Sequence, residues 1–326
     1  MSEDTHRSLR IAMIATGGIA ETALAPAVNA AAGAELWSVL SRDAGRARDF
    51  AERHGAASPR PAYTDLDALL ADPDLDAVII ASADALHADQ CIAAAGAGKH
   101  VLCEKPMATA AADAERMATA CRAAGVRLGI AYHMRWHRGH RDLAAAAHAG
   151  RFGVLRHMRA QWSMRAPNDS NWRARSEVAR WWGLAAVGTH CIDQVRWYML
   201  PSCGEVVRLT PVITRNVFRG PHDETALLAL EFESGATAEV CTSVLFDAPK
   251  RMEVYGSEGY ALFENTLGRY GTGRILTHEG EHAFEPADPY TGEVEDFVAA
   301  VREDRDPEVN GEEGARNVAL LEEAVA

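Results

Sequence analysis

The sequence lacks the features that would place the protein in a membrane or in an oxidising compartment. It has no run of about 18 apolar residues, so we expect no membrane-spanning helix. Residues 1–6 are polar and do not contain the apolar core of a secretory signal. The six cysteines are scattered, and no two of them form a CxxC pair, which argues against structural zinc and a disulfide framework. We therefore predict a cytoplasmic protein.

An excess of positive charge is also missing. The formal net charge is −13, which argues against nucleic acid or an anionic membrane as a partner, because both require a basic surface. Histidines such as His137, His140 and His148 show no tight ligand set, so no metal site is predicted. The hydrophobic content of 48% is typical of a soluble protein, and 326 residues can form two domains.

The first part of the chain alternates between apolar runs and helical patterns. The apolar runs predict strands at residues 9–15, 35–40, 77–81, 100–103 and 127–131. The intervening segments predict helices, among them 65–70, 86–97 and 110–124. This rhythm is typical of a doubly wound parallel sheet of the Rossmann type.

A glycine turn after the first strand indicates dinucleotide binding. Gly17, Gly18 and Ile19 lie between that strand and an alanine-rich helix that we expect to reach about residue 32. Glycines allow a pyrophosphate to approach the backbone there, although Ala15 and Ala20 replace two of the usual glycines. After the second strand, Ser41 and Arg42 stand where an acidic residue would bind a ribose hydroxyl, and this favours NADP over NAD.

The sequence Cys103-Glu104-Lys105-Pro106 ends the apolar run that begins at residue 100. The carboxyl edge of a doubly wound sheet faces the ligand crevice, so the amine of Lys105 is expected at that edge. Such an amine can exchange a proton with a substrate hydroxyl during hydride transfer. We expect Glu104 to tune or anchor Lys105.

The second half of the chain has a different pattern. After a helix at about 138–149, long alternating segments predict strands at 153–165, 205–217, 225–233, 236–246, 251–256 and 260–264. Few helices separate them, which is typical of an open and mainly antiparallel sheet. We predict a Rossmann domain at residues 1–132 and a substrate-binding and oligomerisation domain at 133–326. The exposed sheet face predicts a homodimer or homotetramer.

A further helix at 189–200 carries two candidate catalytic residues. His190 and Asp193 are three residues apart and share one face, so the carboxylate could orient the imidazole. Trp181 and Trp182 could pack in the core or offer an apolar face to a sugar ring. Candidate substrate contacts at the domain junction are Tyr132, His133 and Arg135.

These motifs, in this order, resemble the Gfo/Idh/MocA family of oxidoreductases over nearly the whole chain. The resemblance rests on the glycine turn, Ser41-Arg42-Asp43, His87, Glu104-Lys105-Pro106, Trp172-Arg173, Gly188-x-His190-x-x-Asp193 and Gly256-Ser257-Glu258-Gly259. It implies bound NAD(P), a sugar-like or cyclitol-like substrate, and an active site that contains Lys105 and His190. The cofactor contacts predicted with its help are Gly17, Gly18, Ile19, Ser41, Arg42, Ser82, His87, Glu104, Lys105, Trp172 and Arg173.

Two departures from the family pattern affect the expected substrate. Ala186 stands where members usually carry an aspartate, and Arg180-Trp181-Trp182 replaces a glycine cluster. The chain also stops within its last expected helix, earlier than members usually end. We predict an NAD(P)-dependent dehydrogenase or reductase that acts on a sugar, sugar derivative or cyclitol. The alternatives are a glycosidase that oxidises its sugar transiently through bound NAD, and a cofactor-binding regulator without catalysis.

Overall fold

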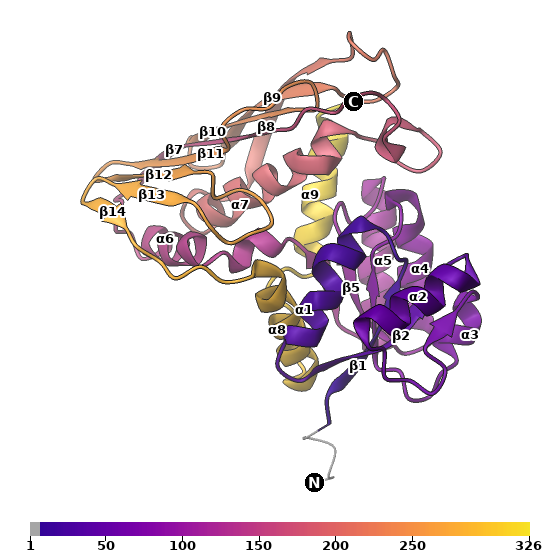
Figure 1. The fold of residues 1–326 in the computed structure, drawn as a ribbon. Coiled ribbons are helices and arrows are strands. Elements are labelled where there is room, and N and C mark those ends of the chain that lie inside the picture. Colours follow the sequence, from indigo (N-terminus) through magenta and orange to yellow (C-terminus); the bar gives the residue numbers. More distant parts are fainter. Residues whose placement is uncertain (1–6) are drawn as a thin grey trace. The chain divides into compact units, whose positions relative to one another are not determined.

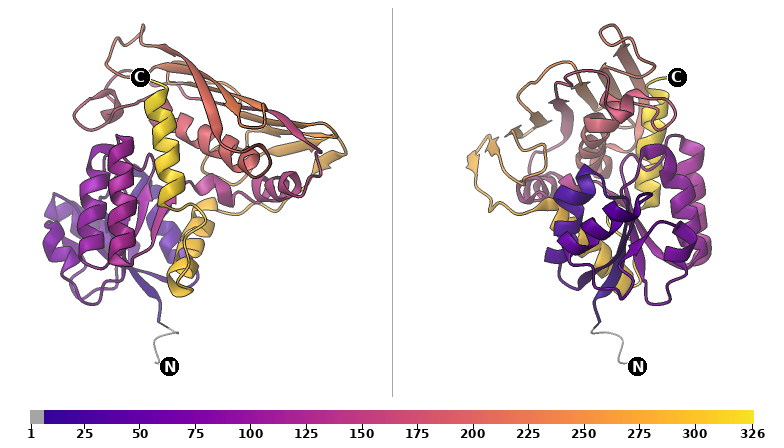
Figure 2. Two further views of the ribbon diagram at one scale, coloured as in Figure 1. Left: turned by 180° about the vertical axis from the view of Figure 1, so that it is seen from behind. Right: turned by 45° about the vertical axis from the view of Figure 1, so that its right-hand side comes forward.

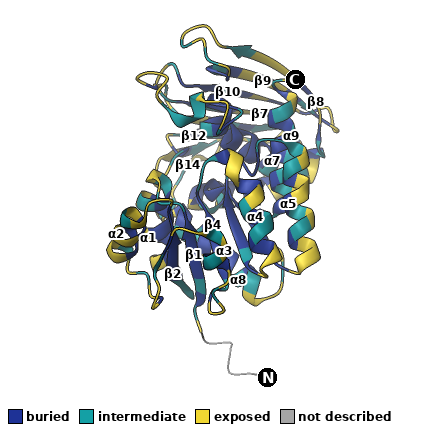
Figure 3. Ribbon diagram, turned by 90° about the vertical axis from the view of Figure 1, so that its right-hand side faces the viewer, coloured by how far each residue is buried: buried dark blue, intermediate teal, exposed yellow. Residues whose placement is uncertain are grey.

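Six parallel strands form the first sheet, in the order β3-β2-β1-β4-β5-β6 (Figure 1). The computed structural model describes residues 7–326. Its first six strands are β1 (Leu9–Ile14), β2 (Ala34–Leu40), β3 (Ala62–Tyr63), β4 (Ala77–Ile80), β5 (His100–Glu104) and β6 (Leu128–Ala131). Strands β4 and β6 are buried at every residue, as expected for a sheet that is covered on both faces (Figure 3). The predicted doubly wound fold is confirmed. Strand β3 was not predicted, because two residues are too few to show a pattern.

Helices cover both faces of this sheet. They are α1 (Ala25–Ala30), α2 (Ala44–His54), α3 (Leu66–Leu70), α4 (His87–Gly96) and α5 (Ala111–Ala124). Helices α4 and α5 lie side by side (Figure 2). The segment after the glycine turn differs from the predicted single helix, because it begins as a π-helical turn at Ala20–Leu24. Pro26, at the start of α1, has no N–H to donate to the preceding turn, which explains the change of helical register there.

The chain returns to the first unit near its C-terminus. Residues up to Tyr132 form one compact unit together with residues 290–318, and residues 133–289 form the other with 319–326. Helix α8 (Pro289–Arg302) places Tyr290, Val294 and Phe297 in the same hydrophobic cluster as β1 and α1. The predicted second domain, residues 133–326, includes this segment, because an apolar helix face does not reveal which sheet it covers. Helix α9 (Gly311–Glu323) follows.

The second sheet has eight strands, in the order β14-β13-β12-β11-β7-β10-β9-β8. They are β7 (Leu155–Ser163), β8 (Val206–Thr214), β9 (Thr225–Phe232), β10 (Thr237–Ser243), β11 (Arg251–Gly256), β12 (Tyr260–Glu264), β13 (Arg274–Thr277) and β14 (Gly280–His282). Only β7 and β10 pair in parallel, so the expected mainly antiparallel sheet is confirmed. The short strands β13 and β14 were not predicted.

Two helices of the second unit support its functional residues. They are α6 (Arg138–His148) and α7 (Thr189–Cys203), and α7 packs against α6 and against β7. Buried His140 joins the two helices, because its Nδ1 lies 2.9 Å from Oε1 of Gln194. Across residues 7–326, every helix is too short or too polar to cross a lipid bilayer.

Candidate functional site

The predicted functional residues of the first unit follow four neighbouring strands at the same edge of the sheet. Strand pairing places Leu40, Ile14, Ile80 and Cys103 in one row across β2, β1, β4 and β5. The residues that come next along these four strands are Ser41, the glycine turn, Ser82 and the Glu104–Lys105 pair. Because all the strands are parallel, these groups lie along one carboxyl edge, where ligands of doubly wound sheets bind.

The glycine turn leaves its backbone open to a ligand. A Cβ atom built at Gly17 or at Gly18 would meet no atom within 4 Å. Ala15, just before the turn, has a φ of 82°, a left-handed conformation that brings the chain sharply out of β1. A diphosphate could therefore approach these amides without meeting a side chain, and the turn fits a dinucleotide. Ile19 directly precedes the helical segment.

Ser41 and Arg42 lie at the end of β2, next to this turn. The Ser41 hydroxyl is 3.4 Å from the Thr16 hydroxyl, so the ends of β1 and β2 are in contact. Asp43 caps α2, because its carboxylate accepts a hydrogen bond of 2.8 Å from the Arg46 amide. The Arg42 side chain is exposed. A guanidinium at the end of β2 suits a ribose 2′-phosphate.

Lys105 is held by the loop in which it lies. Its amide donates a hydrogen bond of 3.1 Å to the Glu104 carboxylate. Buried His87 joins this loop to the one after β4: Nδ1 lies 3.0 Å from the Pro106 carbonyl oxygen, and Nε2 lies 3.2 Å from that of Ser82. This geometry gives His87 a role in positioning the Lys105 loop, in addition to its predicted place near the cofactor.

In the second unit, His190 lies in an aromatic cluster. Its ring stacks on Trp162 at a centroid distance of 5.4 Å, and the ring of His133 meets it edge-on at 4.9 Å. His133 Nε2 lies 3.1 Å from the Gly268 carbonyl oxygen. The structure thus brings the predicted residues His133 and His190 together. Trp162 was missed because an aromatic residue on an alternating strand looks like ordinary core.

Asp193 forms a buried ion pair with Arg135. Its carboxylate accepts three hydrogen bonds from Arg135, the shortest of them 2.6 Å, and the side chains are 1% and 4% exposed. As predicted, Asp193 shares the face of α7 that carries His190, since both contact the turn His133–Trp136. The ion pair favours a structural role for Asp193 and engages the guanidinium of Arg135, which is a candidate substrate contact.

The remaining predicted residues differ in accessibility. Tyr132, Trp181 and Trp182 are buried, and Trp182 packs against Phe218 at 5.2 Å, so both tryptophans fit the core interpretation. A fully buried Trp181 ring has no free face to offer to a sugar. Trp172 and Arg173 are half-buried, and the guanidinium lies 4.1 Å above the indole.

An unpredicted acid fixes the start of the helical segment that leads to His190. Asp223 accepts hydrogen bonds of 2.8 Å from the Trp182 amide and 2.7 Å from the Leu184 amide. Burial raises the pKa of Asp223 to about 6, although these amide donors act in the opposite direction. The π-helical turn Leu184–Gly188, which contains Ala186, follows directly. No sequence signal connects Asp223 to this segment, because the contact spans about 40 residues.

The strand order and the open glycine turn are typical of a dinucleotide-binding domain. Comparison with known families agrees. Residues 9–132 match the model described as an oxidoreductase family with an NAD-binding Rossmann fold, and residues 140–262 match the GFO/IDH/MocA C-terminal domain. The chain belongs to the Gfo/Idh/MocA family and is an NAD(P)-dependent dehydrogenase or reductase.

Similar proteins span nearly the whole chain. A 1,5-anhydro-D-fructose reductase of Ensifer adhaerens is 30% identical over 89% of this chain and 87% of its own length. A D-xylose 1-dehydrogenase (NADP(+)) of Haloferax volcanii is 32% identical over 92% and 91%. Among solved structures, a 3-ketoreductase from Actinomadura kijaniata in complex with NADP and TDP-benzene is 25% identical, with a TM-score of 0.84 over 97% of this chain and 96% of that one.

Proposed function

We propose that this enzyme transfers a hydride between NADP, in preference to NAD, and a secondary alcohol or ketone of a sugar, sugar derivative or cyclitol. The observation that carries the proposal is the position of Lys105, which follows β5 at the same carboxyl edge as the open glycine turn. The similar proteins that are named as a reductase of anhydrofructose and as dehydrogenases of xylose and myo-inositol support this substrate class.

In this proposal, residues of the chain transfer the proton that accompanies the hydride. When bound, the nicotinamide cofactor accepts or supplies the hydride. Lys105, neutral before oxidation, takes the proton of the reacting hydroxyl through Nζ, and in reduction its ammonium returns that proton to the carbonyl oxygen. Glu104 and His87 hold the loop that carries this amine. His190 assists as a hydrogen-bonding partner of the substrate, with its ring oriented by Trp162 and His133. Trp172 and Arg173 are proposed to contact the cofactor.

A screen of sugars and cyclitols with each cofactor tests this function. We expect a substrate-dependent change in nicotinamide absorbance at 340 nm with at least one aldose or cyclitol, or with its ketone. An NAD-dependent glycosidase would instead release an aglycone from a glycoside without a net absorbance change. Absence of both signals from a broad panel would contradict the proposal.

The preference for NADP depends on Arg42 and on the absence of an acid at Ser41. We expect Arg42→Ala to weaken NADP binding about tenfold, because it removes a charge-assisted hydrogen bond to the 2′-phosphate, while NAD binding changes little. Ser41→Asp should weaken NADP further through repulsion. Arg46→Ala, which removes an exposed charge of the same sign in the next helix, is the control. Titrations followed by cofactor fluorescence measure both affinities, and equal or tighter binding of NAD by the wild type would contradict the preference.

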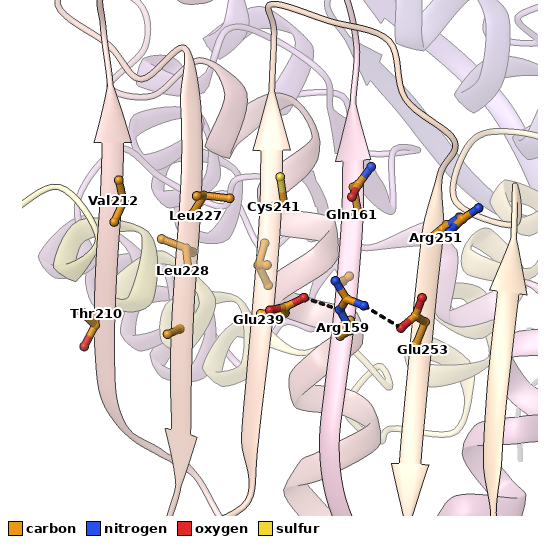
Figure 4. A pocket seen from close by; sticks show the side chains of 13 residues that line it. Arg159, Gln161, Thr210, Val212, Leu227, Leu228, Glu239, Cys241, Arg251 and Glu253 are labelled. Carbon is orange, nitrogen blue, oxygen red and sulfur yellow. Dashed lines mark hydrogen bonds and ion pairs between the residues drawn. The ribbon is translucent and has the colours of Figure 1, made fainter.

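We also propose that the outer face of the second sheet joins copies of the chain into a dimer or tetramer. A depression of about 470 Å³ lies on this face. Figure 4 shows Arg159 between Glu239 and Glu253, and it forms an ion pair with each of them. Beside these paired charges the face is apolar: Val212 and Leu227 are 57% and 46% exposed. Such a surface on an open sheet is typical of self-association.

Light scattering tests the assembly. We expect an oligomer at micromolar concentration, and dissociation when Leu227→Glu places an unpaired charge on the apolar face. Glu279→Gln, a change at an exposed position between β13 and β14, is the control and should leave the mass unchanged. A monomeric wild type would refute this part of the proposal.

The six cysteines are all free thiols, which supports the proposed cytoplasmic location.

A further inference from the structure

The chain uses lysine at only three positions. Of its 33 basic residues, 30 are arginine, and the lysines are Lys99, Lys105 and Lys250. Lys99 is buried and structural, because its ammonium donates to the carbonyl oxygens of Asp72 and Leu75 at 2.9 and 2.8 Å. Lys105 is the proposed proton carrier. Arginine therefore supplies nearly all of the ordinary surface cations of this chain. Because lysine and arginine are not interchangeable, the lysine at position 250 calls for a specific role.

Lys250 lies directly before β11 and is half-buried. Its carbonyl oxygen accepts a hydrogen bond of 2.8 Å from the Asn265 amide, which fixes the backbone at this position. The ammonium nitrogen lies 5.2 Å from the centre of the Trp162 ring, within the range of a cation–π interaction. A Cβ atom built on Gly268 would be 3.0 Å from the same nitrogen, so the glycine backbone lies close to the ammonium.

The neighbours of Lys250 belong to the His190 cluster. The Trp162 ring contacts the Lys250 ammonium and also stacks on the His190 ring. The Gly268 carbonyl oxygen contacts His133. Asp193, the acid on the same face of α7, is occupied by Arg135. Among residues 7–326, no carboxylate lies within ion-pair distance of the Lys250 ammonium. The second unit thus presents a half-buried cation without a counter-ion, which contacts the same Trp162 ring as the histidine that we propose to contact the substrate.

We propose that Lys250 is a specificity-determining residue that binds an anionic substituent of the substrate, a carboxylate or a phosphate group. This inference rests on the proposed sugar oxidoreductase function and narrows its substrate class to acidic sugars. A ligand anion would supply the missing counter-charge at a site already partly removed from water, where a charge-assisted hydrogen bond is strong. Burial lowers the pKa of the Lys250 ammonium, and a bound anion would reverse that shift.

The scarcity of lysine makes direct observation of Lys250 practical. Reductive methylation with ¹³C-formaldehyde labels the three lysines and the terminal amine and preserves their charge. The Lys250 signal is assigned as the one missing from Lys250→Arg. We expect it to shift saturably when the full-length protein is titrated with D-glucuronate, D-galacturonate or the corresponding hexose 6-phosphates, and not with glucose or galactose. The uronates and phosphates separate the two sources of negative charge.

Three results of this titration would overturn the inference. They are no shift of the Lys250 signal with any anionic sugar, an equal shift with the neutral hexoses, and a shift of the same size with NADP alone. The last result would assign the counter-ion to the cofactor. Because binding is read without turnover, a shift with acidic sugars in a protein that reduces or oxidises none of them supports the role of Lys250 and contradicts only the proposed function.

Kinetics of matched variants provide the second test. For the best acidic sugar relative to its neutral hexose, the ratio of kcat/KM should fall at least about tenfold in Lys250→Met, mainly through KM, because a charged hydrogen bond is lost. Lys250→Arg should keep most of the discrimination. Arg151→Met, at an exposed arginine of the same unit, should leave both values unchanged. If Lys250 only packs on Trp162, the methionine of Lys250→Met provides the same packing. The ratio of kcat/KM then stays at the wild-type value, and this result would overturn the inference.

Discussion

Lys105→Met is expected to lower turnover by about a hundredfold to ten-thousandfold, the range that a positioned acid–base group contributes. The methionine keeps most of the volume of the side chain but cannot carry a proton. Cofactor affinity should change little, since the open glycine turn and the Ser41–Arg42 pair lie on other strands. Stopped-flow absorbance at 340 nm measures the hydride step, and quenching of protein fluorescence measures cofactor binding.

Two further variants make the test of Lys105 specific. Lys105→Arg retains the positive charge but cannot release a proton near neutral pH, so it should be nearly as inactive as Lys105→Met. Arg116→Met removes an exposed charge from α5 of the same unit and should behave as the wild type. Wild-type turnover in Lys105→Met, with intact cofactor binding, would show that another group moves the proton.

Asp193→Asn is expected to lower the free energy of unfolding by about 3–5 kcal/mol, because it leaves the buried Arg135 guanidinium without its counter-charge. Urea denaturation followed by circular dichroism measures this loss through the midpoint. The double variant Arg135→Met/Asp193→Leu should recover most of it, because neither charge remains buried. Its stability relative to the two single variants gives the coupling energy.

An exposed ion pair of the same unit provides the control for Asp193. Arg151 and Glu279 are 3.6 Å apart and both 67% exposed, so Glu279→Gln should cost less than about 1 kcal/mol. If Asp193→Asn instead unfolds like the wild type but loses turnover, the catalytic role expected from the sequence would replace the structural one.

The sequence predicts best those features of the structure that depend on residues close together in the chain. The alternation of apolar runs predicts β1, β2, β4, β5 and β6 to within one or two residues, because most residues of each strand are buried. The turn at Gly17 and Gly18 is equally local. Parallel strands also share a carboxyl edge by geometry, so the position of Lys105 beside the glycine turn follows once the fold is predicted.

The parts that were not predicted depend on contacts between distant residues. The ion pair between Arg135 and Asp193 joins positions 58 apart, and the one that links Arg127 to Asp304 spans 177. Lys250 and Trp162 meet because β11 pairs with β7, a pairing that neither strand reveals by itself. The residue types at these positions indicate a charge or a ring, but they do not reveal which distant residue it contacts.

The return of residues 290–318 to the first unit affects how the protein can be synthesised and produced in parts. The hydrophobic cluster around β1 and α1 includes Tyr290, Val294, Phe297 and Val298 of α8. A ribosome therefore completes almost nine-tenths of the polypeptide before the Rossmann core can close. Until then, an apolar sheet face stays uncovered on the nascent chain, where chaperones can bind it. A fragment that ends at Tyr132 should consequently aggregate on expression, whereas the same fragment fused to residues 290–318 through a flexible linker should remain soluble.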